Sequence, residues 1–342
     1  MSDYIIELKN VSKIFKGGMS RKHWTVALDN FSLTVEDGRA EIQTIAGESG
    51  SGKTTLANMV LNFLKPTAGT VYYNGKDIRR ADKKERLQYR KDVQVVFQDP
   101  FAVYNPFFTI DHVFNTMIRN FSITDNTDEA QDRVHDSLRV VGLDPSEVLR
   151  KYPHEFSGGQ LQRIMIARAF LAGPKVIVAD EPVSMIDASL RAKLLEVLLG
   201  LKQDYGISFL YITHDLSTAY HIGDSTMILY RGSLVEHGGT EHVLKNARHP
   251  YVQLLLDSIP LPNPDRLWED DYTLQAGKDL EETEAFALIE GCKFRMRCPR
   301  ATQVCSEAPP PFFEVSGNHH VACYLYSDGN TDVGGNSKSE NA

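Results

Sequence analysis

The sequence predicts an α/β fold built on a parallel sheet with helices on both faces. A glycine-rich phosphate-binding motif at residues 47–55 stands between a predicted strand and a predicted helix. Two compact apolar runs, at 176–179 and 208–212, are typical of central strands buried on both faces. Segments of helical spacing alternate with these strands, at 128–143, 160–171 and 187–203. Such alternation favours a sheet covered by helices on each side.

The bulk composition is that of an ordinary globular protein. The chain has 342 residues, 42% of them hydrophobic and 24% charged, which is enough for one large domain and a smaller one. Its net charge of −8 argues against a nucleic-acid binder, which needs a basic face. We find no apolar run of the ~20 residues that a membrane span requires, and no signal-peptide pattern at the start. We therefore expect a cytosolic protein that meets the membrane only through a partner.

The first hundred residues predict several strands. We expect strands at 4–8, leading on to Phe15, at 26–35, and at 70–73 before the turn signal Asn74-Gly75, with a basic loop at 17–22. The strand at 40–46 runs into the glycine-rich motif, although three of its residues are polar, and the sequence offers no account of them: Glu41, Gln43 and Thr44.

Residues further along the chain continue the pattern. The segment at 77–92 is rich in Lys and Arg and predicts a solvated helix or loop, and residues 94–97 predict a strand. A hairpin is expected around Arg231-Gly232, between strands at 227–230 and 233–236. Composition changes near residue 258, so we expect a domain at 1–257 and a second region at 258–326. That region would begin with a Pro-rich, acidic linker at 259–275, and a disordered tail would follow at 327–342.

The glycine-rich motif matches the P-loop pattern G-x-x-x-x-G-K-[ST] in full. Its glycines let backbone N–H groups converge on a phosphate, and the following helix directs its positive end there. Lys53 is placed to reach the outer phosphates, and the Thr54 hydroxyl to ligate Mg²⁺. The predicted ATP-binding residues of this motif are Gly47, Glu48, Ser49, Gly50, Ser51, Gly52, Lys53, Thr54 and Thr55.

Two carboxylates follow the apolar strand at 176–179. Asp180 suits a role around Mg²⁺, and Glu181 suits a general base that polarises the attacking water. A second motif, Ser157-Gly158-Gly159-Gln160, opens the helix at 160–171, with an N-cap serine and two glycines that permit close approach of a phosphate.

With this second motif the sequence resembles the ATP-binding cassette (ABC) family, whose signature is Leu-Ser-Gly-Gly-Gln. Here Phe156 replaces the leucine. The resemblance implies a RecA-like core, an antiparallel β subdomain and a helical subdomain at about 100–172. It also implies a head-to-tail dimer that encloses two ATP molecules, in which the signature residues of one subunit bind the ATP held by the other: Ser157, Gly158, Gly159 and Gln160.

The same resemblance assigns further residues. Phe15 resembles the aromatic that stacks on adenine, with a core position as the alternative. Gln98 resembles the glutamine that ligates Mg²⁺ and senses the membrane subunit. Residues 184–187 resemble the D-loop, usually Ser-Ala-Leu-Asp, and keep its Asp187. His214 resembles the switch histidine that contacts the γ-phosphate, and would be catalytic together with Glu181.

The C-terminal residues resemble the extension of oligopeptide/dipeptide importer ATPases, on His249-Pro250-Tyr251 and the cysteine segment at 290–325. Disulfides are disfavoured in the cytosol, and close C-x₂₋₄-C pairs typical of zinc are absent. We therefore expect a small cysteine-rich lobe with a [4Fe–4S] cluster, the alternatives being Zn²⁺ and free buried thiols. The expected ligands are Cys292, Cys298, Cys305 and Cys323.

Taken together, the resemblance implies an ATPase subunit of an importer at the cytoplasmic face of the cell membrane. Its partners would be a second ABC ATPase, in a heterodimer, two transmembrane permease subunits and an extracellular substrate-binding protein, with no nucleic acid. Peptides are the expected cargo, and oligosaccharides or nickel are the alternatives. A soluble cassette ATPase of DNA repair or translation is the rival function, and the signature motif disfavours a P-loop kinase or GTPase.

Overall fold

The computed structural model describes residues 3–16, 24–258 and 290–327. The basic loop expected at 17–22 and the linker expected at 259–275 lie outside the described residues. So does all of the tail expected at 327–342 except Ser327.

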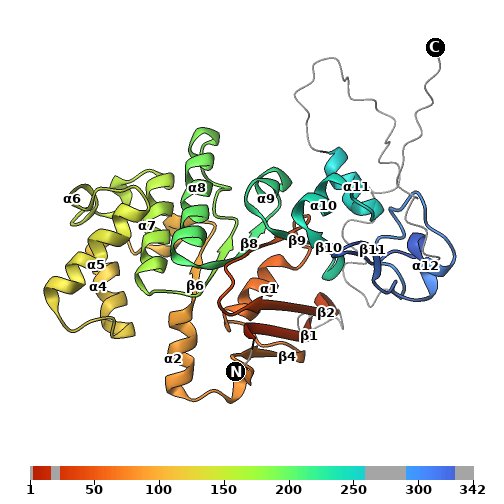
Figure 1. Cartoon of the computed structure of the whole chain (residues 1–342), viewed down its shortest axis with the longest axis horizontal. Helices are drawn as coiled ribbons and strands as arrows, with labels where there is room; N and C mark the ends of the chain where they lie inside the picture. Colours follow the sequence, from red (N-terminus) through yellow and green to blue (C-terminus); the bar gives the residue numbers. More distant parts are fainter. Residues whose placement is uncertain (1–2, 17–23, 259–289, 328–342) are drawn as a thin grey trace, which may run out of the picture.

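The core of the molecule is a mixed sheet in the order β11-β12-β10-β9-β3-β8-β7-β6 (Figure 1). Five neighbouring strands are parallel, as the sequence predicted. They are β9 (Ser225–Tyr230), β3 (Ile42–Ala46), β8 (Ser208–Thr213), β7 (Val176–Asp180) and β6 (Val93–Val96). The strand β10 (Ser233–Gly239) forms the expected hairpin with β9 and begins the antiparallel part of the sheet.

The parallel strands are buried on both faces, which explains their apolar sequences. Ile177 and Phe209 pack on one face of the sheet, against the helices α7 (Gly158–Leu171) and α8 (Ala188–Tyr205). Val178 and Leu210 pack on the opposite face, with α1 (Lys53–Val60). Side chains alternate across a strand, so each strand serves both hydrophobic clusters.

Two of the three polar residues that the sequence left unexplained, Glu41 and Gln43, make side-chain hydrogen bonds, whereas the buried Thr44 hydroxyl has no partner among the described residues. The Gln43 side-chain amide donates to the Thr34 carbonyl at 2.9 Å. Glu41 accepts from the Ser225 hydroxyl at 2.6 Å. These bonds join the start of β3 to the strand at Trp24–Glu36 and to β9.

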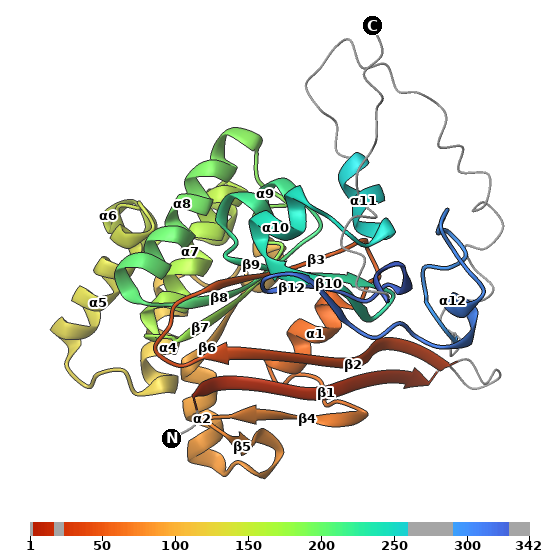
Figure 2. The same cartoon turned by 45° about the vertical axis from the view of Figure 1, so that its right-hand side comes forward.

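A second, antiparallel sheet lies beside the first, with α1 between them (Figure 2). Its order is β2-β1-β4-β5, formed by Trp24–Glu36, Tyr4–Lys16, Ala68–Tyr73 and Lys76–Asp77. A short η1 (Ile78–Arg80) and α2 (Lys83–Asp92) follow. The Lys- and Arg-rich segment is therefore mainly a solvated helix, anchored by buried Tyr89, whose ring packs edge-on against Tyr73 at 5.0 Å.

Residues 100–171 form a group of helices beside α8, at the left of Figure 1. The helix at Ile110–Phe121 is amphipathic and buries Ile110 and Phe114, but the sequence analysis did not predict it. The elements are α3 (Pro100–Val103), α4 (Ile110–Phe121), α5 (Thr127–Val140), α6 (Pro145–Val148), η2 (Pro153–Glu155) and α7.

Three helices and the C-terminal segment complete the structure. The helices are α9 (Leu216–Ile222), α10 (Thr240–Lys245) and α11 (Pro250–Asp257). We call residues 290–327 the C-terminal segment; it contains α12 (Val304–Glu307), β11 (Phe313–Ser316), β12 (His319–Val321) and η3 (Tyr324–Tyr326). Because β12 pairs with β10, the segment continues the main sheet, and the separate cysteine-rich lobe expected from the sequence is not supported.

A buried contact between a carboxylate and an imidazole fixes this junction. Glu236 of β10 and His319 of β12 are both fully buried, with the carboxylate 2.7 Å from the His319 Nε2. Glu236 also accepts the backbone N–H groups of Arg248 and His249. Within the described ranges, the structure has no helix long and apolar enough to cross a bilayer.

Candidate functional site

The P-loop connects the end of β3 to the start of α1, as the motif predicted. Gly52 immediately precedes α1 with φ +105°, in the region that favours glycine. A Cβ at this position would lie 2.3 Å from the Ala27 carbonyl oxygen. Only glycine therefore allows β2 and the start of α1 to approach this closely.

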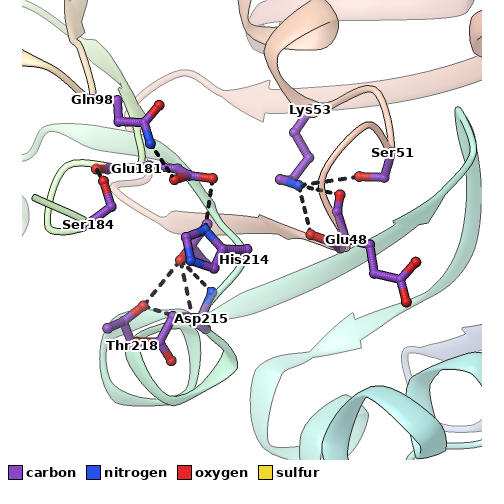
Figure 3. Close-up of polar contacts among 11 residues, drawn as sticks. Glu48, Ser51, Lys53, Gln98, Glu181, Ser184, His214, Asp215 and Thr218 are labelled. Carbon is purple, nitrogen blue, oxygen red and sulfur yellow. Dashed lines mark hydrogen bonds and ion pairs between the residues drawn. The ribbon is translucent and has the colours of Figure 1, made fainter. Parts of the chain in front are cut away.

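The buried amino group of Lys53 lies inside the loop (Figure 3). It donates to the carbonyls of Gly47 at 2.7 Å and Glu48 at 2.8 Å. Burial lowers the pKa of Lys53, while the carboxylates of Glu181, Asp180 and Glu48 oppose that shift. The Lys53 amino group is thus largely desolvated and is held by two backbone carbonyls of the loop.

Two acidic residues lie opposite this lysine, at the end of β7. Burial, followed by the charge of Glu181, raises the pKa of Asp180, and Lys53 opposes the rise. Glu181 adopts a left-handed backbone with φ +46°, and its N–H donates to the Ile212 carbonyl of β8 at 2.9 Å. Such a conformation costs on the order of 1–3 kcal/mol in a residue other than glycine, and is held here by the neighbouring strand.

Both carboxylate oxygens of Glu181 have polar partners. Gln98, which follows β6, donates to Oε2 at 2.8 Å, and His214, which follows β8, lies with Nδ1 2.9 Å from Oε1. Figure 3 shows the Glu181 carboxylate and the Lys53 amino group directed toward each other. The carboxyl ends of β3, β6, β7 and β8 thus bring four predicted residues together, as open parallel sheets do at their binding edge.

The loops that carry Glu181 and His214 are held by hydrogen bonds that the sequence analysis did not predict. The Ser184 hydroxyl donates to the Glu181 carbonyl at 3.0 Å. Asp215 caps α9 by accepting from Ser217 N–H at 2.9 Å, and its own N–H donates to the Thr213 hydroxyl at 2.9 Å. The cap-type residue directly after His214 was the sequence signal that a helix begins there.

The residues 157–160 lie at the start of α7, outside the hydrogen bonds around Lys53 and Glu181. Ser157 and Gln160 form a reciprocal capping box, with bonds of 2.9 and 3.3 Å. Both residues are exposed. A Cβ on Gly158 would lie 3.7 Å from the Met185 carbonyl, so this motif packs beside the 184–187 loop of its own chain.

The remaining predicted residues lie at the surface. Phe15 is 42% exposed, which excludes a core position, and the Lys13 amino group lies 5.2 Å from its ring. Asp187 is exposed at the N-cap of α8. Thr54, in the first turn of α1, is exposed as well.

The prediction of an iron–sulfur cluster or a zinc site on the four cysteines is wrong. In the part of the chain that the structure describes, no group of three or more His, Cys, Asp or Glu side chains is placed to hold a metal ion. Cys292 and Cys298 pack against the apolar cluster around Phe294, and Cys323 packs against Val321. Burial raises the pKa of these three thiols, that of Cys323 to about 12, so they stay neutral. Cys292, Cys298 and Cys323 are therefore packing residues, and all four cysteines are half-buried free thiols.

The fold and the P-loop define a class of ATPase, the ABC cassette. The structure is similar to the dimeric post-hydrolysis state of the ATP-binding cassette MJ0796 bound to ADP and Pi. The TM-score is 0.61 at 30% identity, over 69% of this chain and 98% of that one. The fold alone is also shared with cbiO1 of Clostridium perfringens, at a TM-score of 0.61 and 24% identity over 75% of this chain and all of the other.

Sequence comparisons narrow the class. Residues 28–184 match the family described as ABC transporter, and residues 235–305 match the family described as oligopeptide/dipeptide transporter, C-terminal region. The chain is 38% identical to the oligopeptide transport ATP-binding protein AppF of Bacillus subtilis, over 94% of this chain and 98% of the relative. It is 38% identical to OppF of Escherichia coli, over 87% of each. The chain belongs to the ABC transporter ATP-binding proteins and is an ATPase of this family.

Proposed function

We propose that the chain is the ATP-hydrolysing subunit of an importer for oligopeptides or dipeptides. The relatives AppF and OppF are named as oligopeptide transport ATP-binding proteins, and the match at residues 235–305 carries the same description. The rival function in DNA repair or translation is not favoured by these relatives. Oligosaccharide and nickel remain alternative cargoes.

ATP would bind along the P-loop. Its phosphate oxygens would accept hydrogen bonds from the backbone N–H groups of residues 47–55. The Lys53 amino group would replace its hydrogen bonds to the Gly47 and Glu48 carbonyls with bonds to phosphate oxygens. The exposed ring of Phe15 offers a surface on which adenine stacks. The start of α1 adds its positive end toward the phosphates.

Glu181 is proposed as the general base. It takes a proton from a water whose oxygen attacks the γ-phosphorus, and the bond to ADP breaks as inorganic phosphate forms. The observation that carries this role is that both Glu181 oxygens are held, by Gln98 and His214, while the carboxylate faces Lys53. His214 would orient the base and contact the γ-phosphate.

The donors around this carboxylate fit Mg²⁺. Thr54, Gln98 and Asp180 offer hydroxyl, amide and carboxylate oxygens, the donor types that Mg²⁺ prefers. The half-buried Asp180 carboxylate lies beside the negative charge of Glu181, an arrangement that a cation stabilises. When bound, Mg²⁺ neutralises charge on the β- and γ-phosphate oxygens. Thr54, Gln98 and Asp180 would hold the ion at this edge of the sheet.

The exposed residues fit a dimer in which two chains enclose two ATP molecules. Ser157, Gly158, Gly159 and Gln160 would bind the γ-phosphate held by the partner, using the start of α7. The adjacent loop ending at Asp187 would contact the partner as well. We propose a heterodimer with a second ABC ATPase, docked on two permease subunits at the cytoplasmic face of the membrane, with an extracellular binding protein.

The test is ATP hydrolysis and transport by the full chain in proteoliposomes, together with the partner ATPase and permease subunits from neighbouring genes. Peptide-loaded binding protein should stimulate both phosphate release and uptake of a labelled oligopeptide. Stimulation by an oligosaccharide or nickel instead would replace the cargo and keep the importer. Stimulation by DNA or ribosomes, without uptake, would overturn the proposal.

A further inference from the structure

The C-terminal segment contacts the P-loop at Glu48. The Arg297 guanidinium binds the Glu48 carboxylate through two bonds, Nη1 to Oε2 at 3.1 Å and Nη2 to Oε1 at 3.2 Å. A bidentate pair of this kind fixes the orientation of both side chains as well as their charge. It joins residues that are 249 positions apart in the chain.

The backbone of Glu48 is held at two further points. Its N–H donates to the Tyr251 hydroxyl of α11 at 2.9 Å, and its carbonyl accepts from Lys53 at 2.8 Å. A rotation of Glu48 would therefore move a carbonyl that sets the position of the P-loop lysine. Arg297 and Tyr251, which both lie outside the P-loop, are therefore linked through Glu48 to the Lys53 amino group.

Arg297 and Tyr251 are themselves fixed by an aromatic cluster, which we define as Tyr230, Tyr251 and Phe294. The ring centroids in this cluster are 4.6 to 5.6 Å apart. Tyr251 and Phe294 are almost fully buried. The Arg297 guanidinium lies 5.8 Å from the Phe294 ring and 5.9 Å from the Tyr230 ring. The cluster therefore holds the arginine on a rigid support.

A second ion pair attaches the same stretch of chain to the antiparallel sheet. Lys293 lies 3.0 Å from the Asp29 carboxylate of β2 and donates to the Arg231 carbonyl at 3.1 Å. The backbone around Arg297 is thus joined to both sheets close to the P-loop. The position of Arg297 relative to Glu48 follows from the fold and does not depend on their ion pair alone.

The charges of the Arg297–Glu48 pair also affect the binding of nucleotide. An unpaired carboxylate at Glu48 would add a negative charge to the loop that receives the phosphates of ATP. Arg297 cancels that charge. Because the Arg297 and Glu48 side chains are 33% and 41% exposed, solvent and salt screen the effect. Pairs of this exposure are worth at most about 1 kcal/mol, or about a fivefold change in an equilibrium constant.

We propose that Arg297 is a positioning residue of the nucleotide site. By binding Glu48 it holds the P-loop in the conformation that accepts phosphate, and it cancels a charge that would repel ATP. The inference rests on the proposed role of the P-loop as the ATP site. It assigns to the C-terminal segment a part in nucleotide affinity.

The test compares dissociation constants for Mg-ATP in the full-length chain. Wild type is measured first, followed by Arg297→Met, Arg297→Lys, Glu48→Gln and the double variant Arg297→Met/Glu48→Gln. Arg297→Met should weaken ATP binding by up to about fivefold. Arg297→Lys should give an intermediate loss, because it keeps the charge and loses the bidentate geometry. The double variant should bind ATP more tightly than Arg297→Met but less tightly than wild type, because the unpaired charge is gone while the bond that positions Glu48 is still missing. In the assembled complex, Arg297→Met should raise KM for ATP and leave kcat close to wild type.

Arg295→Met is the matched control. Arg295 lies in the same stretch and donates to the carbonyls of Glu290 and Cys292, so its loss affects the segment without touching Glu48. Its ATP affinity should equal that of wild type. Equal losses in Arg295→Met and Arg297→Met would overturn the inference in favour of segment stability. Wild-type affinity in Arg297→Met would also overturn the inference, and so would a double variant that recovers no affinity. In either case, ATP binding by wild type would still support the proposed function. Failure of wild type to bind ATP would overturn the proposed function and this inference together.

Discussion

Glu181 and His214 lie at the ends of two neighbouring parallel strands, with Oε1 of the carboxylate 2.9 Å from Nδ1 of the imidazole. The second oxygen of the same carboxylate accepts from Gln98 at 2.8 Å. With both oxygens occupied, the carboxylate has little rotational freedom. A general base that is oriented before the substrate arrives loses less entropy in the reaction.

Glu181→Gln is expected to abolish most ATP hydrolysis and to leave ATP binding intact. Glutamine has nearly the same shape and can still contact His214, but it cannot accept the proton from water. Loss of a general base costs on the order of 10²–10⁴ in rate. Phosphate release by the assembled complex and ATP binding by the full chain measure the two effects. Glu241→Gln, at an exposed pair with Lys245, is the control and should hydrolyse ATP like wild type. A wild-type rate in Glu181→Gln would show that another group is the base.

Ser157→Arg should block hydrolysis at the partner's site more than ATP binding at its own P-loop. The serine is exposed at the start of α7, where a bulky cation would obstruct a partner's phosphate and oppose the helix dipole. Mixed dimers with the change in one subunit distinguish the two sites. Ser157→Ala controls for loss of the cap, which alone costs about 1 kcal/mol of stability. A variant that loses ATP at its own P-loop would contradict the proposed dimer geometry.

Gly52→Ala should destabilise the fold more than Gly50→Ala. Both glycines have positive φ, +105° and +77°, so alanine is strained at each. A Cβ at Gly50 would point into open space, and its replacement should cost about 1–2 kcal/mol. A Cβ at Gly52 would also collide with the Ala27 carbonyl, which forces β2 and α1 apart. Chemical denaturation of the two variants measures the free energy of unfolding. Equal losses of unfolding free energy in the two variants would show that β2 can move away from the added Cβ without an energetic cost.

The stability of the protein should fall as pH drops below about 6.5, in part because of His249. Burial lowers the pKa of this side chain to about 3, from 6.5 in the unfolded chain. Between these values the unfolded state binds the additional proton. The stabilisation is therefore complete above pH 6.5 and is lost as pH falls toward 3, by up to about 1.4 kcal/mol per pH unit.

His249→Asn tests this contribution. The His249 side chain caps α11 by accepting from Tyr251 N–H at 3.0 Å, and asparagine can serve as the cap without titrating. Unfolding free energies are measured between pH 4 and 7 in both proteins. The variant should be less stable at pH 7 and should show a shallower pH dependence. Parallel curves would mean that His249 does not titrate on unfolding.

The sequence was sufficient to predict the central sheet and the residues at its edge. The apolar runs that became β7 and β8 favoured buried parallel strands, and parallel strands place their carboxyl ends together. Lys53, Glu181 and His214 could therefore be predicted to meet before any distance was known. The proposed roles of these residues remain predictions that the variants above test.

Contacts between distant segments could not be predicted in this way. The strand β12 exists because it pairs with β10, about 80 positions earlier, and its three residues carry little strand signal by themselves. The cysteines were misinterpreted for a related reason. Spacing along the chain suggested a shared ligand set, whereas burial against Phe294 and Val321 was visible only in the fold. The Arg297–Glu48 pair, 249 positions apart, is a further contact of this kind.

At Glu181, the left-handed backbone makes fold stability and the proposed catalytic role favour different residues. Glycine would adopt φ +46° without strain, so Glu181→Gly is expected to leave the fold at least as stable while it removes the proposed base. A selection for thermal stability alone would accept that exchange. Selection for ATP turnover would reject it. Retention of a strained glutamate at this position therefore indicates selection for ATP hydrolysis, because selection for fold stability alone would replace it.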